Sequence, residues 1–263
     1  MATFHCEFAS SSLARQARFE LVLPNDVPEE FVKKGNSNYD RPMGLLIVLH
    51  GYTASSTEWL QNSRIAMWAG KYNLAVALPN CENSFYLNRP STGFKYADYV
   101  GKELPEYVRS TFGITGDNYI GGESMGGFGA LHTAFMFPEN FRKAFAFSSA
   151  LIHREVAGMK EGSGNPVANY EYYREMFGEP AELLESENSP EWLYTDRKAA
   201  GRKLPPVFMA CGTEDFLYAN NLAMKAFLEE QGADFEFHEG PGVHNFDFWD
   251  AWLEPAVEWM VKA

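Results

Sequence analysis

The stretch Gly121–Gly127, GGESMGG, places a single serine among four glycines. Its middle five residues have the form Gly-x-Ser-x-Gly, with Ser124 at the centre. This spacing is typical of a serine on a turn so sharp that only glycine fits on either side, which leaves the hydroxyl group exposed. Such a hydroxyl can act as a nucleophile when a neighbouring base takes its proton. Because five residues are a weak signal, the flanking segments must support this interpretation.

Apolar residues lie close to the glycines on both sides. The segment 118–124 is typical of a buried strand, and GGFGALHTAFMF after the serine has apolar residues at helical spacing. A flexible linker would not place Tyr119, Ile120 and Phe128 beside its glycines. A strand, a sharp turn and a helix are the context that this motif requires. The first N–H groups of the helix would face the negative charge that develops during reaction.

Six histidines are candidates for the base. We favour His244, because it lies in the loop GPGVHNF just after the last predicted strand and well downstream of Ser124. The others lie near the terminus, within predicted helices or strands, or at the start of other segments: His5, His50, His132, His153 and His238. Of these, His50 is expected to pack beneath a turn and to take no part in catalysis.

Two adjacent carboxylates, Glu214 and Asp215, follow the strand that precedes His244. A short carboxylate on a tight turn at this position can reach an imidazole at the end of the neighbouring strand, so we favour Asp215. Asp247 is a weaker candidate, because it follows the histidine in the chain. The carboxylate of such a triad holds the histidine in the correct tautomer and does not itself take the proton.

A developing oxyanion also needs hydrogen-bond donors. The segment LHGYTAS, 49–55, directly follows an apolar strand, where the second donor of such sites usually lies. A turn at Gly51 would direct the backbone N–H of Tyr52 inward, beside the N–H of Met125, the residue after the serine. The alternative is an ordinary glycine turn with no part in the chemistry.

Short apolar runs alternate with longer amphipathic segments along the chain. Predicted strands cover 17–24, 44–50, 74–80, 118–124, 143–149, 205–212 and 235–242. Predicted helices lie between them: one ends at Gly113, one ends before Pro138, a third buries Leu222, Ala226 and Phe227, and a weaker one includes Trp252 and Val257. This alternation predicts the α/β class, with a mainly parallel sheet in a single domain over 1–263.

One segment, 153–204, is too long for a single connection. We expect it to form an insertion over the carboxyl ends of the strands. Ligands of open α/β sheets bind at that edge.

The formal net charge of −13 argues against nucleic acid or an anionic membrane as partner and favours a neutral small-molecule substrate. The same charge is also explained by solubility alone. Three widely spaced cysteines, with no visible signal peptide, favour a cytoplasmic protein. We expect no metal and no cofactor, since no cluster has ligand spacing. Exposed edge strands would permit a homo-oligomer.

With LHGYTAS, GESMGG, CGTEDFLY and GVHNFDFW in this order, the sequence resembles the esterase D family of serine esterases. It is most similar to the tributyrin-esterase-like members, which are kin of S-formylglutathione hydrolases and of feruloyl and acetyl-xylan esterases. The resemblance runs from about Arg18 to Trp259 and implies an α/β-hydrolase fold. It cannot be matched position by position within 153–204.

The resemblance implies Ser124 as nucleophile, His244 as base and Asp215 as its partner. It also implies that the amides of Tyr52 and Met125 form the oxyanion hole. Tyr52 departs from the pattern, because many relatives carry a smaller or aliphatic residue there, and its ring could narrow the pocket or stack on an aryl group.

Further positions are expected to contact the substrate. The predicted substrate-binding residues are Gly51, Phe85, Tyr86 and Trp249. The aromatic residues among them suggest a small or an aryl-bearing acyl group.

These residues predict a serine carboxylesterase that cleaves short-chain acyl esters through an acyl-enzyme. Feruloyl or cinnamoyl esters, acetylated carbohydrates and S-formylglutathione-type thioesters are alternatives that use the same machinery. Two other hypotheses are acyl transfer to an alcohol and a ligand-binding module without turnover. The second is disfavoured because every catalytic residue type is present.

Overall fold

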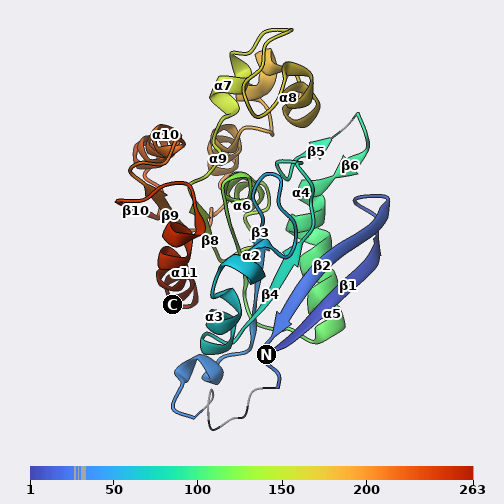
Figure 1. Ribbon diagram of the computed structural model, residues 1–263, viewed down its shortest axis with the longest axis vertical. Helices are drawn as coiled ribbons and strands as arrows, with labels where there is room; N and C mark the ends of the chain where they lie inside the picture. The colour runs from blue at the N-terminus through green and yellow to red at the C-terminus, as the bar shows by residue number, and fades with distance from the viewer. Residues whose placement is uncertain (27, 29, 31–33, 90, 263) are drawn as a thin grey trace.

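The computed structural model describes residues 1–26, 28, 30, 34–89 and 91–262, and its centre is an eight-stranded sheet (Figure 1). The strand order is β1-β2-β4-β3-β7-β8-β9-β10; β1 and β2 are antiparallel to their neighbours and the rest run parallel. The strands are β1 (Ala2–Ser10), β2 (Arg15–Leu23), β3 (Gly44–Leu49), β4 (Leu74–Pro79), β7 (Asn118–Glu123), β8 (Lys143–Phe147), β9 (Val207–Gly212) and β10 (Phe235–Gly240). A separate pair comprises β5 (Asn88–Arg89) and β6 (Phe94–Lys95).

The predicted parallel sheet of the α/β class is confirmed. Strands β3, β4 and β9 are buried along their whole length, as continuous apolar runs covered on both faces should be. Strand β1 was not predicted. Its burial alternates along the strand, with Phe4, Cys6 and Phe8 packed against the core, so it is an edge strand with one face in solvent.

Helices cover both faces of the sheet (Figure 1). One face packs against α5 (Leu104–Phe112), α6 (Met125–Met136) and α10 (Tyr218–Glu230), and the other against α2 (Glu58–Asn62), α3 (Ile65–Lys71) and α11 (Phe246–Val261). The remaining helices are η1 (Ser37–Asp40), α4 (Tyr96–Asp98), the π-helical turn η2 (Tyr99–Glu103), α7 (His153–Ala157), α8 (Tyr170–Phe177), η3 (Pro180–Glu185) and α9 (Pro190–Ala199). Each fully buried large apolar side chain in these layers contributes roughly 1.5–3 kcal/mol to the free energy of unfolding.

The predicted third helix is confirmed as α10, and Phe227 packs partly buried against the core, but the fully buried face differs from the expected one. Ala226 is exposed, whereas Asn221, Met224 and Leu228 are buried. The orientation follows from Asn221, whose side chain accepts a hydrogen bond from Ser149 N–H at 3.1 Å and donates one to Ser149 O at 3.0 Å. A buried amide with satisfied hydrogen bonds can therefore occupy a core position, which an apolar pattern does not reveal.

Only part of the insertion lies over the carboxyl ends of the strands. Figure 1 shows α7 and α8 at the top of the view, and the Tyr172 hydroxyl of α8 donates to Asn83 O at 2.6 Å in the loop after β4. The Phe177 ring lies 4.7 Å from that of Phe85, in the same loop. Helix α9 instead packs along α6. The prediction that the whole of 153–204 covers this edge therefore holds for α7 and α8, against which η3 also packs, and not for α9.

His132 is a buried, neutral histidine in α6. Its Nε2–H donates to Glu187 O at 2.8 Å, and the side chain is fully enclosed. Burial lowers the pKa of His132 from 6.5 to about 4, because the charged imidazolium would lose its hydration.

This residue should make the fold sensitive to acid. The unfolded chain takes up a proton near pH 6.5 and the folded chain only near pH 4, so the contribution of His132 is complete above pH 6.5 and is lost as the pH falls toward 4. The ~2.5 unit difference corresponds to about 3 kcal/mol at most. In urea denaturation at about pH 7.5 and about pH 5, wild type should lose more stability than His132→Gln, which keeps the donor. Equal losses would contradict the assignment.

Candidate active site

Ser124 lies on a strained turn between β7 and α6. Its backbone angles are φ 53° and ψ −119°, in the positive-φ region that favours glycine. Such a conformation costs of order 1–3 kcal/mol and persists only where the surroundings enforce it. Here Ser124 N–H donates to Phe147 O at 2.9 Å, and Ser124 O accepts from Ala150 N–H at 2.8 Å. Strand β8 and the residues after it thus hold the serine in place.

The two glycines of the motif allow the chain to pass close to its neighbours. A Cβ atom on Gly122 would lie 2.6 Å from the backbone of Gly126, and one on Gly126 would lie 2.2 Å from Leu49 O. Both distances are far below van der Waals contact, and the clashing atoms belong to backbone that cannot move aside. Any side chain at either position would separate the start of α6 from β3.

The structure brings together Ser124, His244 and Asp215 from three separate chain segments. Ser124 Oγ lies 2.9 Å from His244 Nε2, and His244 Nδ1 lies 2.9 Å and 3.1 Å from the two carboxylate oxygens of Asp215. A carboxylate only accepts hydrogen bonds, so Nδ1 carries the proton and Nε2 is free to accept one from Ser124. This tautomer is the one required for His244 to act as a base toward the serine.

Asp215 is enclosed and held by several donors. Its side chain is fully buried, and its Oδ1 accepts the Leu217 N–H at 2.8 Å. Burial by itself would raise the pKa of Asp215, but the hydrogen bonds from His244, Leu217 N–H and Ser148 outweigh it and hold the pKa below its usual value. Ser148 is itself fixed by Trp249 Nε1, which donates to its Oγ at 2.9 Å.

The two alternative carboxylates are not brought to His244. Glu214 is exposed and accepts the Gly242 N–H at 2.6 Å and the Thr213 hydroxyl at 2.9 Å. Asp247 accepts from the Asn245 side chain at 3.2 Å in the first turn of α11. Asp215 is therefore the carboxylate that orients the histidine.

The loop after β3 is fixed by hydrogen bonds at the peptide between Gly51 and Tyr52. His50 Nε2 accepts the Cys81 N–H at 3.0 Å, so Nδ1 carries the proton and donates to Gly51 O at 2.8 Å. The N–H of a trans peptide points away from its carbonyl, so this bond fixes the direction of the Tyr52 N–H. Burial lowers the pKa of His50, which keeps the ring neutral in this role. His50 is thus a hydrogen-bonding anchor, and the expectation of simple packing was incomplete.

The Met125 N–H belongs to the first turn of α6, directly after Ser124. Backbone N–H groups in that turn have no acceptor within the helix, so they are available to a bound anion. Two donors from separate elements, Met125 of α6 and Tyr52 of the β3 loop, are thus candidates for one oxyanion.

Most of the predicted substrate-binding residues are buried and pack against the catalytic loops. Tyr86 is fully buried and its hydroxyl donates to His50 O at 2.8 Å, and Trp249 is buried with its ring 4.9 Å from that of His244. Tyr86 has no exposed surface and Trp249 only 5%, so both contact the catalytic loops from within the protein, and their predicted contact with substrate stays a prediction. Phe85 is also buried, and it packs behind the half-buried ring of Tyr52. The Gly51 N–H is occupied by Glu58 Oε2 at 2.8 Å.

Phe216 is a site residue that sequence reasoning missed. Its side chain is 73% exposed, and its ring lies 4.5 Å from that of His244. Val243, beside the histidine, is 49% exposed. An apolar rim therefore borders the histidine on the solvent side. The available signal was the position of Phe216 immediately after Asp215, on a turn where apolar residues are not expected.

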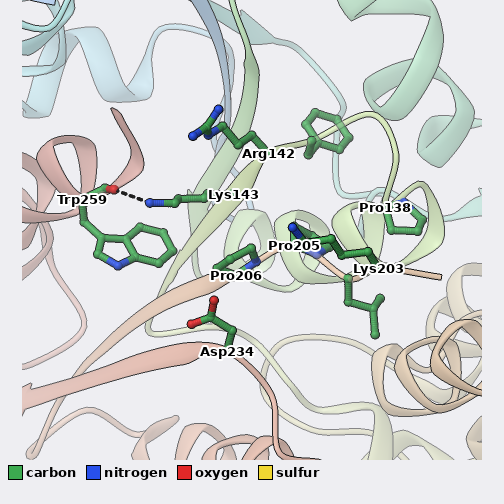
Figure 2. A pocket seen from close by; sticks show the side chains of 10 residues that line it. Pro138, Arg142, Lys143, Lys203, Pro205, Pro206, Asp234 and Trp259 are labelled. Atoms are coloured by element: carbon green, nitrogen blue, oxygen red, sulfur yellow. Dashed lines mark hydrogen bonds between the residues drawn. The ribbon is translucent and has the colours of Figure 1, made fainter. Parts of the chain in front are cut away.

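A hollow of about 520 Å³ lies far from these residues, at the opposite edge of the sheet (Figure 2). It is bordered by residues that precede β8, β9 and β10, including Arg142, Pro206 and Asp234. The Lys143 side chain lines this hollow and is already hydrogen-bonded, since its Nζ donates to Trp259 O at 2.9 Å. Ligands of such sheets bind at the carboxyl ends of the strands, so this hollow is not the candidate active site.

Comparison with known proteins identifies the family. A family model described as "Putative esterase" matches residues 10–260. An acetyl esterase from Caldicellulosiruptor saccharolyticus is 36% identical over 265 residues, covering 100% of this chain and 99% of that protein. The chain belongs to this esterase family. The esterase is therefore a carboxylic-ester hydrolase.

Solved structures agree with this assignment. The fluorophosphonate-binding serine hydrolase FphF of Staphylococcus aureus superposes with a TM-score of 0.84 at 26% identity, covering 100% of this chain and 99% of FphF. The S-formylglutathione hydrolase FrmB of Staphylococcus aureus gives a TM-score of 0.81 at 26% identity, with 99% of each chain covered. The esterase thus has an α/β-hydrolase-type fold, as predicted, and is a serine esterase. Within the described residues, no helix is both long and apolar enough to cross a membrane.

The anchoring of the β3 loop by His50 leads to a kinetic prediction. In His50→Leu the bond to Gly51 O is lost, so the Tyr52 N–H is no longer held in one direction. Loss of an oxyanion donor costs about 10²–10³ in rate, so kcat for p-nitrophenyl acetate should fall by about tenfold or more with little change in KM. His238→Leu, in β10, is the matched control and should leave kcat close to wild type. A fall in both variants, or in neither, would contradict this role.

Proposed function

We propose that this esterase hydrolyses short-chain acyl esters with Ser124 as nucleophile, His244 as general base and Asp215 as the orienting carboxylate. The observation that carries the proposal is the chain of hydrogen bonds from Ser124 Oγ through both nitrogens of His244 to Asp215. A serine hydroxyl is a poor nucleophile at its own pKa, and this arrangement supplies the base that it needs.

In the first half-reaction, His244 Nε2 takes the Ser124 proton as Oγ attacks the carbonyl carbon of the ester. The carbonyl oxygen gains the electron pair and becomes an oxyanion between the N–H groups of Tyr52 and Met125. Collapse of this intermediate breaks the bond to the alcohol, which leaves with the proton from His244. Ser124 then carries the acyl group.

In the second half-reaction, His244 takes a proton from water, whose oxygen attacks the acyl carbon. The same two N–H groups donate hydrogen bonds to the new oxyanion. Collapse releases the carboxylic acid and returns the proton to Ser124 Oγ. Throughout, the Asp215 carboxylate stays ionised and stabilises the imidazolium that forms twice in each cycle.

A short acyl group is supported by a relative and by the aromatic side chains near the proposed hole. The 36% identical relative is named an acetyl esterase. The Tyr52 ring, whose own N–H is a proposed donor, lies 5.9 Å from the Tyr172 ring and 6.3 Å from the Phe85 ring. If the Tyr52 N–H binds the oxyanion, this group of rings lies beside the acyl group and would limit its length.

A thioester of the S-formylglutathione type is the second candidate. FrmB, a solved S-formylglutathione hydrolase, matches the esterase over 99% of each chain. A formyl group is smaller than acetyl, and a thiolate is a better leaving group than an alkoxide, so the same residues would serve. Feruloyl esters, a further expectation from the sequence, need space for an aryl ring beside Tyr52.

The cellular compartment of the esterase, the charge of its substrate and its self-association are also proposals. Cys6, Cys81 and Cys211 are free thiols, which supports a reducing compartment such as the cytoplasm. The net charge of −13 supports a neutral small-molecule substrate, and the exposed edge strand β1 would permit self-association.

Three substitutions test the triad. Ser124→Ala and His244→Ala should each lose orders of magnitude in kcat toward p-nitrophenyl acetate, and Asp215→Asn should lose about 10⁴ because it favours the wrong tautomer. Glu214→Gln is the matched control, since its carboxylate lies one residue away and does not contact His244. Activity that survives in Ser124→Ala would overturn the proposal.

A substrate panel separates the acyl groups. We expect kcat/KM to be highest for acetyl and to fall through butyryl to feruloyl esters, because the aromatic rings around Tyr52 restrict acyl length. S-formylglutathione should be measured beside them at the same enzyme concentration. A preference for the feruloyl ester would contradict the short-chain assignment, and a preference for the thioester would favour the second candidate.

A further inference from the structure

Glu123, the residue before Ser124, carries a buried carboxyl group to which the proposed mechanism gives no part. It is 1% exposed at the end of β7. Within the described part of the chain, no amide or hydroxyl donor lies within reach of its Oε1. A buried, ionised carboxylate with an unpartnered oxygen would be strongly destabilising.

The carboxyl group of Glu123 lies directly against the β3 loop. A Cβ atom on Gly51 would be 2.4 Å from Glu123 Oε1 and 3.0 Å from Oε2. A side chain at position 51 would therefore require the Glu123 carboxyl group to move. Glu123 thus packs directly against the residue that precedes Tyr52.

A second carboxyl group meets the first at the same point. Glu58, in the first turn of α2, accepts the Gly51 N–H through Oε2 at 2.8 Å. Glu58 thus lies on the N–H side of Gly51 and Glu123 beside its Cα, so the two carboxyl groups meet at this residue, and a hydrogen bond between them is among the causes that raise the pKa of Glu123. Two carboxyl groups can form a hydrogen bond with each other only if one of them carries a proton.

The surroundings decide which group holds that proton. Burial raises the pKa of Glu123 well above its usual value, and the neighbouring charges of Glu58 and Asp215 raise it further. Two other titratable groups interact with the pair, Tyr86 and His50. Both are neutral, since burial raises the pKa of Tyr86 and lowers that of His50.

We propose that Glu123 is a positioning residue that keeps its proton at neutral pH and donates it to Glu58, so that the acid pair fixes the Gly51 turn of the oxyanion hole. The bond joins the end of β7 to the start of α2 across the loop that holds Tyr52. The pair then carries one negative charge, on Glu58, in place of two. This inference rests on the proposed hydrolysis at Ser124 and adds a residue to it.

An infrared measurement tests the proton directly. The difference spectrum of wild type minus Glu123→Gln at about pH 7 should show the C=O band of a protonated carboxylic acid, because Gln removes that acid alone. Glu103→Gln is the matched control. Hydrogen bonds from Ser10, Ser11 and Ser12 outweigh the effect of burial on Glu103 and lower its pKa, so its difference spectrum should show only a carboxylate band. Absence of the acid band for Glu123 would overturn the proposal, whether or not the protein hydrolyses any ester.

Kinetics test the positioning role. Glu123→Gln retains a neutral donor of the same shape, whereas Glu123→Leu has similar size and no donor. In p-nitrophenyl acetate hydrolysis, kcat of the Leu variant should be about tenfold or more below that of the Gln variant, with similar KM, since the oxyanion donor is then less well held. Equal kcat values in two folded variants would overturn the role. The Ser124→Ala variant tests the proposed hydrolysis separately, so a failure of the positioning role can be told apart from a failure of the proposed function. If the Leu variant does not fold, the infrared measurement decides the proposal.

Discussion

The close approach of three backbone segments around Ser124 is the constraint on which the rest of this site depends. The start of α6 can lie against the end of β3 only because Gly122 and Gly126 have no side chains. This contact forces the positive φ of Ser124 and directs its hydroxyl away from the sheet. Two hydrogen bonds of the Ser124 backbone, one with Phe147 at the end of β8 and one with Ala150 after it, offset the conformational cost. A serine on a relaxed turn would not meet the histidine.

A parallel sheet brings distant residues to this point. Strands β3, β7, β9 and β10 all end at the same edge, and the loops after them carry the Gly51 turn, Ser124, Asp215 and His244. Hydrogen bonds to buried polar groups then fix each loop: His50 holds the first, Asn221 the residues after β8, and Ser148 joins Asp215 to Trp249. Because buried polar groups are costly when unpaired, each of these bonds favours a single arrangement of the edge.

Two buried carboxyl groups close to Ser124 illustrate how environment assigns protonation. Asp215 receives several hydrogen-bond donors, which hold its pKa low and keep it ionised beside His244. Glu123 faces another carboxyl group and little else that could stabilise a charge, so its pKa is high. One negative charge is thus placed beside His244, where an imidazolium forms, while Glu123, the residue before Ser124, stays neutral. Two carboxyl groups within one site thus differ in protonation because their surroundings differ.

The sequence by itself determined the features that depend on local sterics and periodicity. Apolar runs marked the parallel strands to within one or two residues, and the glycines around Ser124 marked a strand–turn–helix bend. The order of Ser124, Asp215 and His244 along the chain was also visible, together with the family, because these residue types and spacings are set within short segments.

Only the tertiary structure decided which groups meet. It placed the Asp215 carboxylate within hydrogen-bonding distance of His244 and left Glu214 exposed to solvent. It also gave His50 its hydrogen bond to Gly51 O and buried Tyr86 and Trp249. It also turned α10 about Asn221 and paired Glu123 with Glu58. The physical reason is common to all of them: each depends on hydrogen bonds between residues far apart in the chain, and the energy of those bonds depends on burial that no local pattern records.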